Sequence, residues 1–477
     1  MLSRNDCHPN DSIKRSLIPL ITVVFVLLAR APGFPQTDDG AAGESQDQTE
    51  RSITEAREKQ EEIWRQTLRF GIDSEVIATI DEIQSEEIVD LYDEIADIFE
   101  DSRSSVREKI IDFFIEVEDF RLYPEVQREL LFYQDVSDNL VIRYLSFIKN
   151  DERPLTKDLW DVITEILQGS NNNLIAAVIP IIGEKGDPTY SDTLKELYEK
   201  DRQSTSIKAQ ILRSLGTLSV PEDRDFLEES ATDASEETLL RQSAIEALGL
   251  MADKESLPVL KELVESDEVL IRTSVMSSLS NFPREEISPI FSDGLKDSYW
   301  RIRQGILRNL RDNPIPELEP AVGFVAQRDP ERVVRLTGYE TLTAYDSDYA
   351  WSIILEDAES GTTPEAIRVQ LYSYLAEKKF SFGKTLLLKI IEEEWEKPNS
   401  RILDAICKAL SESTDPEAVP VFERMLDHGE ITIKIYGIRG LSNQGGESHR
   451  ERIDGFLADG QHPAIQRAAE RALRRIE

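Results

Sequence analysis

The chain carries few side chains that could perform catalysis or hold a metal ion. It has four histidines and two cysteines, and neither an HExxH zinc motif nor a GxSxG nucleophile motif occurs. Cys407 shares a helical face with Leu403, Ile406 and Leu410, which predicts a buried small hydrophobe rather than a nucleophile. Carboxylates are so abundant that no pair stands out as catalytic. We therefore expect no enzyme activity, no metal site and no small-molecule cofactor.

Two short segments imitate ligand-binding loops. Residues 382–385 (Phe-Gly-Lys-Thr) look like the end of a P-loop, but the upstream glycine that a P-loop requires is replaced by Lys378. Residues 346–348 (Asp-Ser-Asp) lack the glycine and the final glutamate of a calcium loop. The first segment therefore does not indicate nucleotide binding, and the second predicts a turn.

One class of charged residue does recur with a regular spacing. A basic side chain stands seven residues before a repeated apolar position in eight places: Arg107, Lys208, Arg241, Arg272, Arg303, Arg335, Arg368 and Lys434. A cation near a helix start opposes the helix dipole, so its recurrence requires a compensating partner.

Acidic residues just upstream offer such partners. Asp267, Asp297 and Asp329 precede the arginines of their own repeats by five or six residues. Each aspartate is expected to cap its helix and to pair with the arginine of its own or the next repeat. The series predicts a structural ladder between repeats. The alternative is a stripe that binds an anionic ligand.

The repeated apolar position, which we call the anchor, is the last large apolar residue of each first helix. Successive anchors are 31 to 35 residues apart: Phe114, Ile148, Ile182, Leu215, Leu248, Leu279, Leu310, Leu342, Leu375, Leu410, Leu441 and Leu473. A period of this length is typical of solenoids built from stacked helix pairs. It predicts an all-α fold, an α-solenoid of about 12 helix-turn-helix repeats.

The residues around the anchors support this helical register. Four residues before most anchors stands another apolar or small residue, which defines one helix face. One residue before them, small groups such as Ser214, Ala247 and Ser278 are common, so neighbouring helices are expected to approach closely. A second helix follows each anchor, most plainly over residues 257–264, where Pro258 fits the first turn.

These segments resemble the HEAT-repeat family, in particular its short type shared with phycobilisome lyases. The similarity is strongest over residues 240–249 (Leu-Arg-Gln-Ser-Ala-Ile-Glu-Ala-Leu-Gly) and 257–264, and it recurs at 271–279 and 302–310. It covers residues 114–477 well, and residues 51–113 as degenerate N-terminal repeats. The resemblance implies a curved solenoid that serves as a protein-interaction scaffold. It also leaves open a lyase-like enzyme or an enzyme-accessory protein.

The N-terminus is typical of an export signal. Lys14 and Arg15 precede an apolar run of 13 residues, 17–29, and small residues follow at Ala29 and Ala31. We expect a signal peptide over residues 1–31, a disordered linker over 32–50, and a periplasmic or secreted location. The alternative is an uncleaved run that tethers the chain to the inner membrane as a structural element.

A formal net charge of −37 argues against nucleic-acid binding and against binding to anionic membrane surfaces. Residues 73–119 contain 17 acidic residues and only three basic ones. Such a stretch is expected to form a solvated, solubilising surface, and the alternative is a docking surface for a basic protein or for divalent cations. The candidate docking residues are Glu86, Glu87, Asp90, Asp93, Glu94 and Asp97, and Trp300 is a further candidate anchor for a partner. The sequence therefore predicts an exported scaffold that binds another protein.

Overall fold

The computed structural model describes residues 57–200, 203–444, 447–458 and 461–476. Every regular element in these ranges is a helix, so the predicted all-α solenoid is confirmed. The expected signal peptide and linker lie outside the described residues. The chain divides into two compact units whose boundary falls between Phe113 and Phe114, inside helix α5 (Ser104–Glu116).

Unit 1, in its described part, is a small group of helices. Residues 57–70 form the first helix. The elements that follow are α3 (Asp73–Ser85), η1 (Val89–Leu91), α4 (Tyr92–Asp97) and the first part of α5. Ile80, Ile83, Ile95 and Phe99 are buried among them. This unit carries most of the acidic stretch identified in the sequence.

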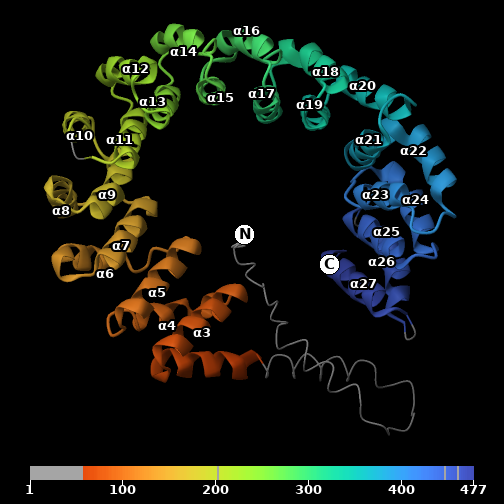
Figure 1. Cartoon of the computed structure of the whole chain (residues 1–477). Coiled ribbons are helices and arrows are strands. Elements are labelled where there is room, and N and C mark those ends of the chain that lie inside the picture. The colour runs from red at the N-terminus through yellow and green to blue at the C-terminus, as the bar shows by residue number, and fades with distance from the viewer. Residues whose placement is uncertain (1–56, 201–202, 445–446, 459–460, 477) are drawn as a thin grey trace, which may run out of the picture. The chain divides into compact units, whose positions relative to one another are not determined.

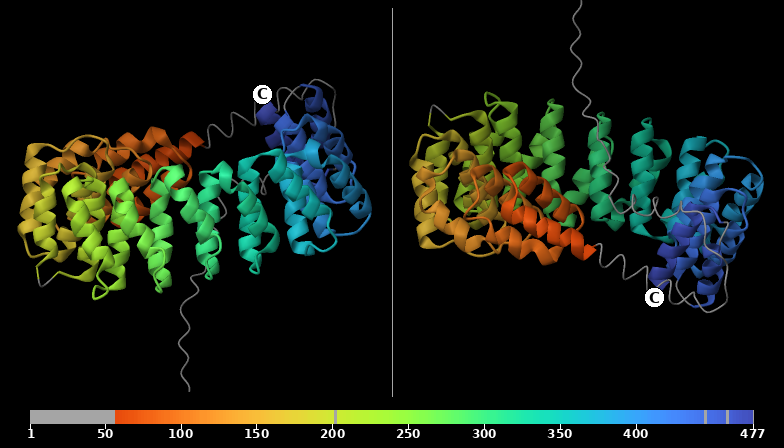
Figure 2. Two further views of the ribbon diagram at one scale, coloured as in Figure 1. Left: turned by 90° about the horizontal axis from the view of Figure 1, so that it is seen from above. Right: turned by 90° about the horizontal axis from the view of Figure 1, so that it is seen from below.

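Unit 2 is a curved row of helix pairs. Odd-numbered helices lie along its inner side and even-numbered helices along its outer side (Figure 1). The further views show the helices running side by side across the row (Figure 2). We call the two rows the inner helices and the outer helices.

The inner helices contain ten of the twelve anchors; Phe114 lies in α5, and Leu279 directly follows α15, in η5 (Leu279–Asn281). The inner helices are α7 (Asp138–Asn150), α9 (Asn172–Lys185), α11 (Thr205–Leu218), α13 (Thr238–Met251), α15 (Val269–Ser278), α17 (Trp300–Asp312), α19 (Arg332–Tyr345), α21 (Glu365–Lys378), α23 (Arg401–Leu410), α25 (Ile431–Gln444) and α27 (Pro463–Ile476). Eleven of the twelve predicted anchors are fully buried, and Leu473 is half-buried. The periodic apolar residue therefore marks the core of each repeat.

The outer helices follow after short turns. They are α6 (Tyr123–Leu130), α8 (Lys157–Gln168), α10 (Tyr190–Tyr198), α12 (Arg224–Thr232), α14 (Leu257–Leu263), α16 (Arg284–Gly294), α18 (Glu319–Arg328), α20 (Asp348–Glu359), α22 (Phe380–Glu394), α24 (Val419–Leu426) and α26 (Glu447–Asp454). Short 3₁₀ turns join several pairs, such as η4 (Lys254–Ser256) before α14. Pro258 lies in the first turn of α14, as expected.

Four repeats end their first helix, which is α5 in one case and an inner helix in the others, with a left-handed residue four positions after the anchor. These residues are Glu118, Ser219, Ala252 and Asp346, with φ between 49° and 54°. The left-handed conformation stops the helix and turns the chain towards the outer helix. Because none of the four is glycine, each repeat tolerates a local backbone cost of about 1 kcal/mol for this turn.

Neighbouring inner helices touch where both carry small residues. A Cβ added at Gly216 would lie 2.5 Å from the Cα of Ala247, and one at Gly249 would lie 2.5 Å from the Cβ of Ser278. Each glycine directly follows an anchor, and each contacted residue directly precedes the next anchor. The close approach expected from the small residues before the anchors is confirmed, and the glycines that complete it become visible only in the structure.

Candidate functional site

The arginines seven residues before the anchors link consecutive repeats at two steps of the row. Nε of Arg272 lies 2.9 Å from Oδ2 of Asp297, and Nε of Arg303 lies 2.6 Å from Oδ2 of Asp329. In both pairs a second guanidinium nitrogen donates to the other carboxylate oxygen. The arginines also donate to backbone carbonyls just before their own helices, those of Ser266 and Asp297. Each arginine therefore joins the turns of two successive repeats.

The other basic residues of the predicted ladder have different partners. Arg241 pairs with Glu268 and donates to the carbonyl of Ala231, and Arg335 donates to the carbonyl of Ala326. Lys208 lies over the Tyr198 ring, and Arg107, in unit 1, lies over the Phe99 ring. Nε of Arg368 is buried without a hydrogen-bond partner in the described part of the chain, and Lys434 is half-buried. A carboxylate therefore completes only part of the series.

The expected capping role of the aspartates is wrong. The N-caps of α17 and α19 are Tyr299 and Glu331, and neither side chain makes a capping hydrogen bond. Asp297 instead accepts a hydrogen bond from the backbone N–H of Tyr299, and Asp329 accepts one from that of Glu331. These are Asx turns two residues ahead of the cap position. This position leaves the carboxylate free to face the arginine of the preceding repeat.

Asp267 departs from the prediction in another way. It contributes its backbone carbonyl to Arg272 at 3.4 Å, and its side chain is exposed. Glu268, the next residue, takes the place of the inter-repeat carboxylate by pairing with Arg241. The expected pairing with the arginine of the same or the next repeat is therefore wrong: the carboxylates of Glu268, Asp297 and Asp329 pair with the arginine of the preceding repeat.

The Arg272–Asp297 contact changes the acidity of the carboxyl group. Burial by itself raises the pKa of Asp297, but the hydrogen bonds from Arg272 and from the Tyr299 N–H outweigh it. The pKa of Asp297 is therefore lowered from its ordinary value. The charged pair is the state that the fold stabilises at neutral pH.

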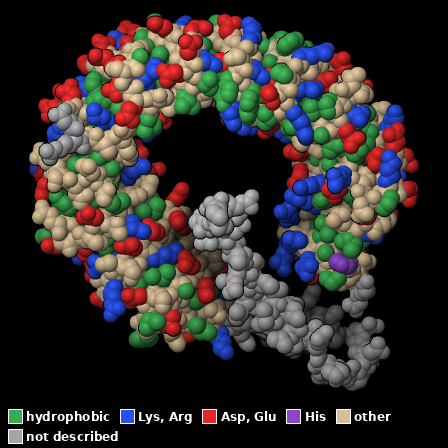
Figure 3. All heavy atoms as spheres, in the orientation of Figure 1, with side chains coloured by type: hydrophobic (Ala, Val, Ile, Leu, Met, Phe, Trp, Pro, Cys, Tyr) green, Lys and Arg blue, Asp and Glu red, His purple; other side chains and the backbone are tan. Residues whose placement is uncertain are grey.

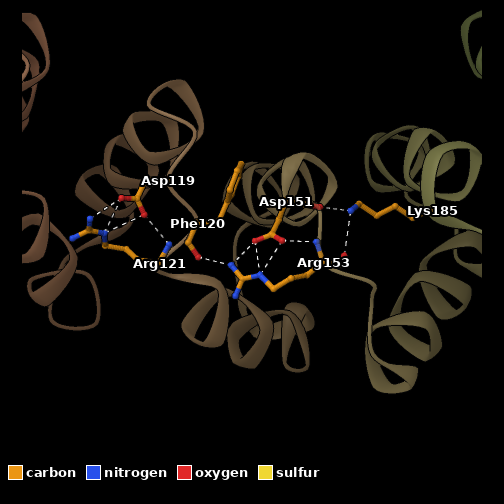
Figure 4. A network of polar contacts seen from close by, with 6 residues as sticks. All are labelled: Asp119, Phe120, Arg121, Asp151, Arg153 and Lys185. Atoms are coloured by element: carbon orange, nitrogen blue, oxygen red, sulfur yellow. Dashed lines mark hydrogen bonds and ion pairs between the residues drawn. The ribbon is translucent and has the colours of Figure 1, made fainter. Parts of the chain in front are cut away.

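A second network joins repeats near the start of unit 2 (Figure 4). Arg153 donates to both carboxylate oxygens of Asp151 at 2.9 Å and to the carbonyl of Phe120, one repeat earlier, at 2.9 Å. Lys185, one repeat later, donates to the carbonyls of Asp151 and Arg153. Arg121 and Asp119 repeat the same Asp-x-Arg turn, with the Arg121 Nε 3.1 Å from both carboxylate oxygens. The recurrence of Asp-x-Arg after 32 residues is the sequence signal that identifies these two turns.

A shallow hollow of about 760 Å³ lies beside these turns. Ile115, Phe120, Asn150 and the two arginines, Arg121 and Arg153, are among its lining residues. Arg153 also lies over the Tyr123 ring, 4.3 Å from its centroid. Since the charged groups here are engaged with each other and with backbone carbonyls, the arrangement fastens three repeats together.

The residues that imitate catalytic or ligand-binding motifs contribute to packing, ion pairs and helix caps. Cys407 is fully buried in α23, and burial raises the pKa of its thiol to about 12. Lys384, in the P-loop-like segment, lies within α22 and pairs with Glu417 at 2.9 Å. Ser347 caps α20 by accepting a hydrogen bond from the N–H of Ala350, so residues 346–348 form a turn.

Among the described residues, no group of three or more His, Cys, Asp or Glu side chains is arranged to hold a metal ion. Within the same ranges, every helix is too short or too polar to cross a membrane.

The candidate docking residues of the acidic stretch lie on the surface of unit 1. Glu86, Glu87, Asp90, Asp93 and Asp97 are exposed, at the end of α3, in the turn that follows it and on α4. Glu94 is half-buried and pairs with Arg65, whose Nε lies 2.9 Å from Oε1. Five of the six side chains are therefore accessible to a basic partner.

Trp300, the other residue expected to contact a partner, lies at the start of α17. It is half-buried and packs under Arg301, whose guanidinium carbon is 4.4 Å from the ring centroid. This contact covers part of the ring, and Trp300 is therefore only partly available to a partner.

The inner helices leave one face exposed along the row (Figure 1), which we call the inner surface. Neighbouring inner helices flank each inner helix and an outer helix lies behind it, so only this face remains open. Residues nine positions before the anchors are exposed in nine successive repeats: Asn173, Ser206, Leu239, Leu270, Arg301, Val333, Ala366, Arg401 and Thr432. Residues two positions before the anchors lie two turns further along the same face.

Part of the inner surface is apolar, and at one glycine the helix has open space where a side chain would stand. Leu239, Leu270 and Val333 are 44%, 57% and 40% exposed. At Gly305, in the middle of α17, an added Cβ would meet nothing within 4 Å. Packing inside the chain therefore does not require a glycine there, although glycine weakens a helix interior.

Charge separates between the two rows of helices. The inner helices α7 to α27 contain 23 basic and 9 acidic residues, whereas the outer helices α6 to α26 contain 12 basic and 26 acidic ones. The space-filling view shows Lys and Arg gathered along the inner edge over α17 to α27 and many Asp and Glu along the outer edge (Figure 3). A protein that is acidic as a whole therefore presents a basic inner row.

Comparisons with known proteins agree with this architecture. The model of the family described as spirochaete HEAT repeat protein matches residues 68–472. Comparison with curated proteins gives no match.

Three solved structures illustrate the similarity of fold. A Kap95p structure with RanGDP is 10% identical, with a TM-score of 0.45, over 87% of this chain and 60% of that one. The CpcE–CpcF complex of phycocyanin lyase from Nostoc sp. PCC7120 is 15% identical, with a TM-score of 0.30, over 54% and 97%. Human deoxyhypusine hydroxylase is 14% identical, with a TM-score of 0.26, over 66% and 95%. At these identities the likeness concerns the fold alone.

Proposed function

Because the chain belongs to the spirochaete HEAT repeat protein family, we propose that it is a scaffold that holds another protein against its inner surface and performs no catalysis of its own. Solenoids of this kind use their extended concave faces for binding. The observation that carries the proposal is the inner surface itself, where one open face recurs through nine repeats with exposed Leu239, Leu270 and Val333.

The chemistry of this surface supports binding rather than catalysis. Apolar side chains that remain exposed in a row give a partner a place to bury area. Buried ionisable groups such as Arg303 and Asp329 form ion pairs that join consecutive repeats. Cys407, the nucleophile candidate, is fully buried.

Site-specific photo-crosslinking tests the proposal in the native cell. A photoreactive residue replaces Leu239, Leu270 or Ala366 on the inner helices, or Phe324 or Leu388 on the outer helices as matched exposed controls. We expect the inner positions to capture the same partner and the outer positions not to capture it. Capture from the outer positions alone would contradict the proposed binding face.

We also propose that the protein works outside the cytoplasm, on the basis of the apolar run at residues 17–29. N-terminal sequencing of the protein isolated from its cells tests this step. A mature start close to residue 32 supports a cleaved signal and a periplasmic or secreted protein. An intact N-terminus in the membrane fraction supports the tethered alternative instead.

A further inference from the structure

The last three inner helices carry the densest exposed positive charge in unit 2. Helices α23, α25 and α27 together contain eight basic and two acidic residues, whereas the outer helices α24 and α26 beside them contain three basic and four acidic ones. Seven of the eight basic side chains are exposed: Arg401, Lys408, Arg439, Arg467, Arg471, Arg474 and Arg475. Arg401, Lys408, Arg439 and Arg471 stand nine or two residues before their anchors, which are the positions of the inner surface, and we call these four the basic inner surface.

Three of these cations form a row across neighbouring helices. Lys408, Arg439 and Arg471 each stand two residues before the anchor of their own repeat. Equivalent positions of successive repeats lie side by side, about 10 Å apart for packed helices. In the six preceding repeats the same position alternates among basic, acidic and neutral residues, so three consecutive cations occur only here.

These charges are not explained by ion pairs within the protein. Arg439 pairs with Glu412, and among the described residues the other six of the seven exposed cations have no carboxylate within ion-pair distance. Their other hydrogen bonds are weak. Nη1 of Arg475 donates to Oδ1 of Asn443 at 3.4 Å, and Nε of Arg471 donates to the carbonyl of Arg467 in the same helix. Within the described ranges, this surface therefore keeps positive charge exposed without a carboxylate partner.

The helix dipole accounts for only part of the pattern. Lys408, Arg474 and Arg475 lie in last turns, where a cation is favourable. Arg401, however, is the first residue of α23, where the dipole disfavours a cation. A ligand of opposite charge explains why this position is basic.

We infer that the basic inner surface binds an extended acidic segment of the partner protein, with its carboxylates against the row of Lys408, Arg439 and Arg471. This inference rests on the proposed scaffold function and specifies the chemistry of its partner. Three cations about 10 Å apart span about 20 Å. An extended segment in the polyproline II conformation rises about 3.1 Å per residue and presents every third side chain on one face. About seven residues with a carboxylate at every third position therefore match the row.

The observations favour an acidic protein segment over a nucleic acid. Duplex nucleic acid carries about one charge per 1.7 Å, far denser than one cation per repeat. The outer helices, with 26 acidic and 12 basic residues, would repel such a polymer as it wraps the row. Sparse carboxylates on an extended peptide match the spacing of the cations.

Fluorescence anisotropy with the full chain tests the inference. The probe is a labelled peptide of about 12 residues with glutamate at every third position, compared with the same peptide carrying glutamine. The variant K408E/R471E reverses two exposed charges of the row. The variant R284E/K389E makes the same change of charge at exposed positions on the outer helices. Circular dichroism verifies that both variants retain their helical content.

We expect K408E/R471E to weaken binding of the glutamate peptide by about tenfold or more and R284E/K389E to weaken it less than about twofold. Raising the salt concentration from about 50 to 300 mM should weaken wild-type binding as well. Equal binding of the glutamine peptide, or equal loss in both variants, overturns the inference. Tighter binding of a single-stranded DNA of the same length, lost in K408E/R471E, overturns the choice of a protein segment.

The two proposals fail in different ways. If photo-crosslinking from Leu239 or Ala366 captures a partner while K408E/R471E leaves peptide binding unchanged, the scaffold function stands and the acidic segment does not. If neither inner position captures a partner, the scaffold function is contradicted, whatever the result of the peptide experiment.

Discussion

Arg303 and Asp329 face each other from consecutive repeats, with both guanidinium–carboxylate contacts in place at 2.6 and 2.8 Å. Their side chains are only 9% and 3% exposed. The same arginine bonds the carbonyls of Asp297 and Ser298 at the start of its own helix, and the same aspartate accepts from the N–H of Glu331. One residue pair therefore ties together two turns that are about one repeat apart in the sequence.

Removing the arginine of this pair should destabilise the protein. Arg303→Ala leaves a buried carboxylate without its partner and is expected to lower the free energy of unfolding by about 3–5 kcal/mol. Arg272→Ala, in a slightly more exposed pair, should cost about 1–3 kcal/mol. Urea unfolding followed by circular dichroism measures both. Arg213→Ala, which breaks the exposed Arg213–Glu246 pair, is the control and should cost less than about 1 kcal/mol. Similar losses in all three variants would show that the buried ladder has no special role.

The lowered pKa of Asp297 predicts how stability changes in acid. Because the folded-state pKa lies below the unfolded value of about 3.9, the stabilisation is complete above that pH and is lost as pH falls through the folded pKa. Asp297→Asn should therefore lower stability at pH 7 and flatten the fall in stability below about pH 4. Thermal melts across this pH range measure the difference. An identical pH profile in the variant would count against the contribution of Asp297.

Two glycines on inner helices should respond oppositely to alanine. Gly216→Ala places a Cβ 2.5 Å from the Cα of Ala247, and this overpacking should cost about 1–3 kcal/mol. Gly305→Ala meets open space and should stabilise α17 by up to about 1 kcal/mol through helix propensity. Paired denaturation curves decide the sign. A stabilised Gly216→Ala protein would mean that the two inner helices can separate at little cost.

Cys407 should report the opening of α23. Burial raises the pKa of its thiol to about 12, so at pH 8 only about one molecule in ten thousand carries the reactive thiolate. We expect iodoacetamide to leave the Cys407 peptide unmodified in the native protein and to modify it in urea, as measured by peptide mass spectrometry. Reading the peptide rather than the whole protein keeps Cys7 out of the result. Fast modification under native conditions would contradict the buried position.

Much of the architecture follows from local sequence. The anchors at Leu215, Leu248 and Leu310 are fully buried, and the second helix expected over residues 257–264 appears as α14. These features could be predicted because helix periodicity and repeat length are encoded within about 33 consecutive residues. The recurrence of a basic residue seven positions before the anchors belongs to the same local information.

The choice of partners could not be read from the sequence. Arg303 had a carboxylate at Asp297 in its own repeat and one at Asp329 in the next, and only the stacked turns place Asp329 against it. Arg153 reaches the carbonyl of Phe120, a backbone atom that no side-chain pattern identifies. The requirement for glycine at position 216 depends on the close approach of Ala247 from the next repeat, which only the structure shows.

The sequence alone therefore determined the repeat, its register and its helical class, because these depend on contacts within one helix pair. Tertiary structure decided which helices form the inner row, and with them the separation of basic and acidic surface. That separation depends on how the curve exposes one face of each first helix while neighbouring repeats and an outer helix cover the rest. The net charge of −37 sums the residues of both rows, so it does not reveal the basic inner surface.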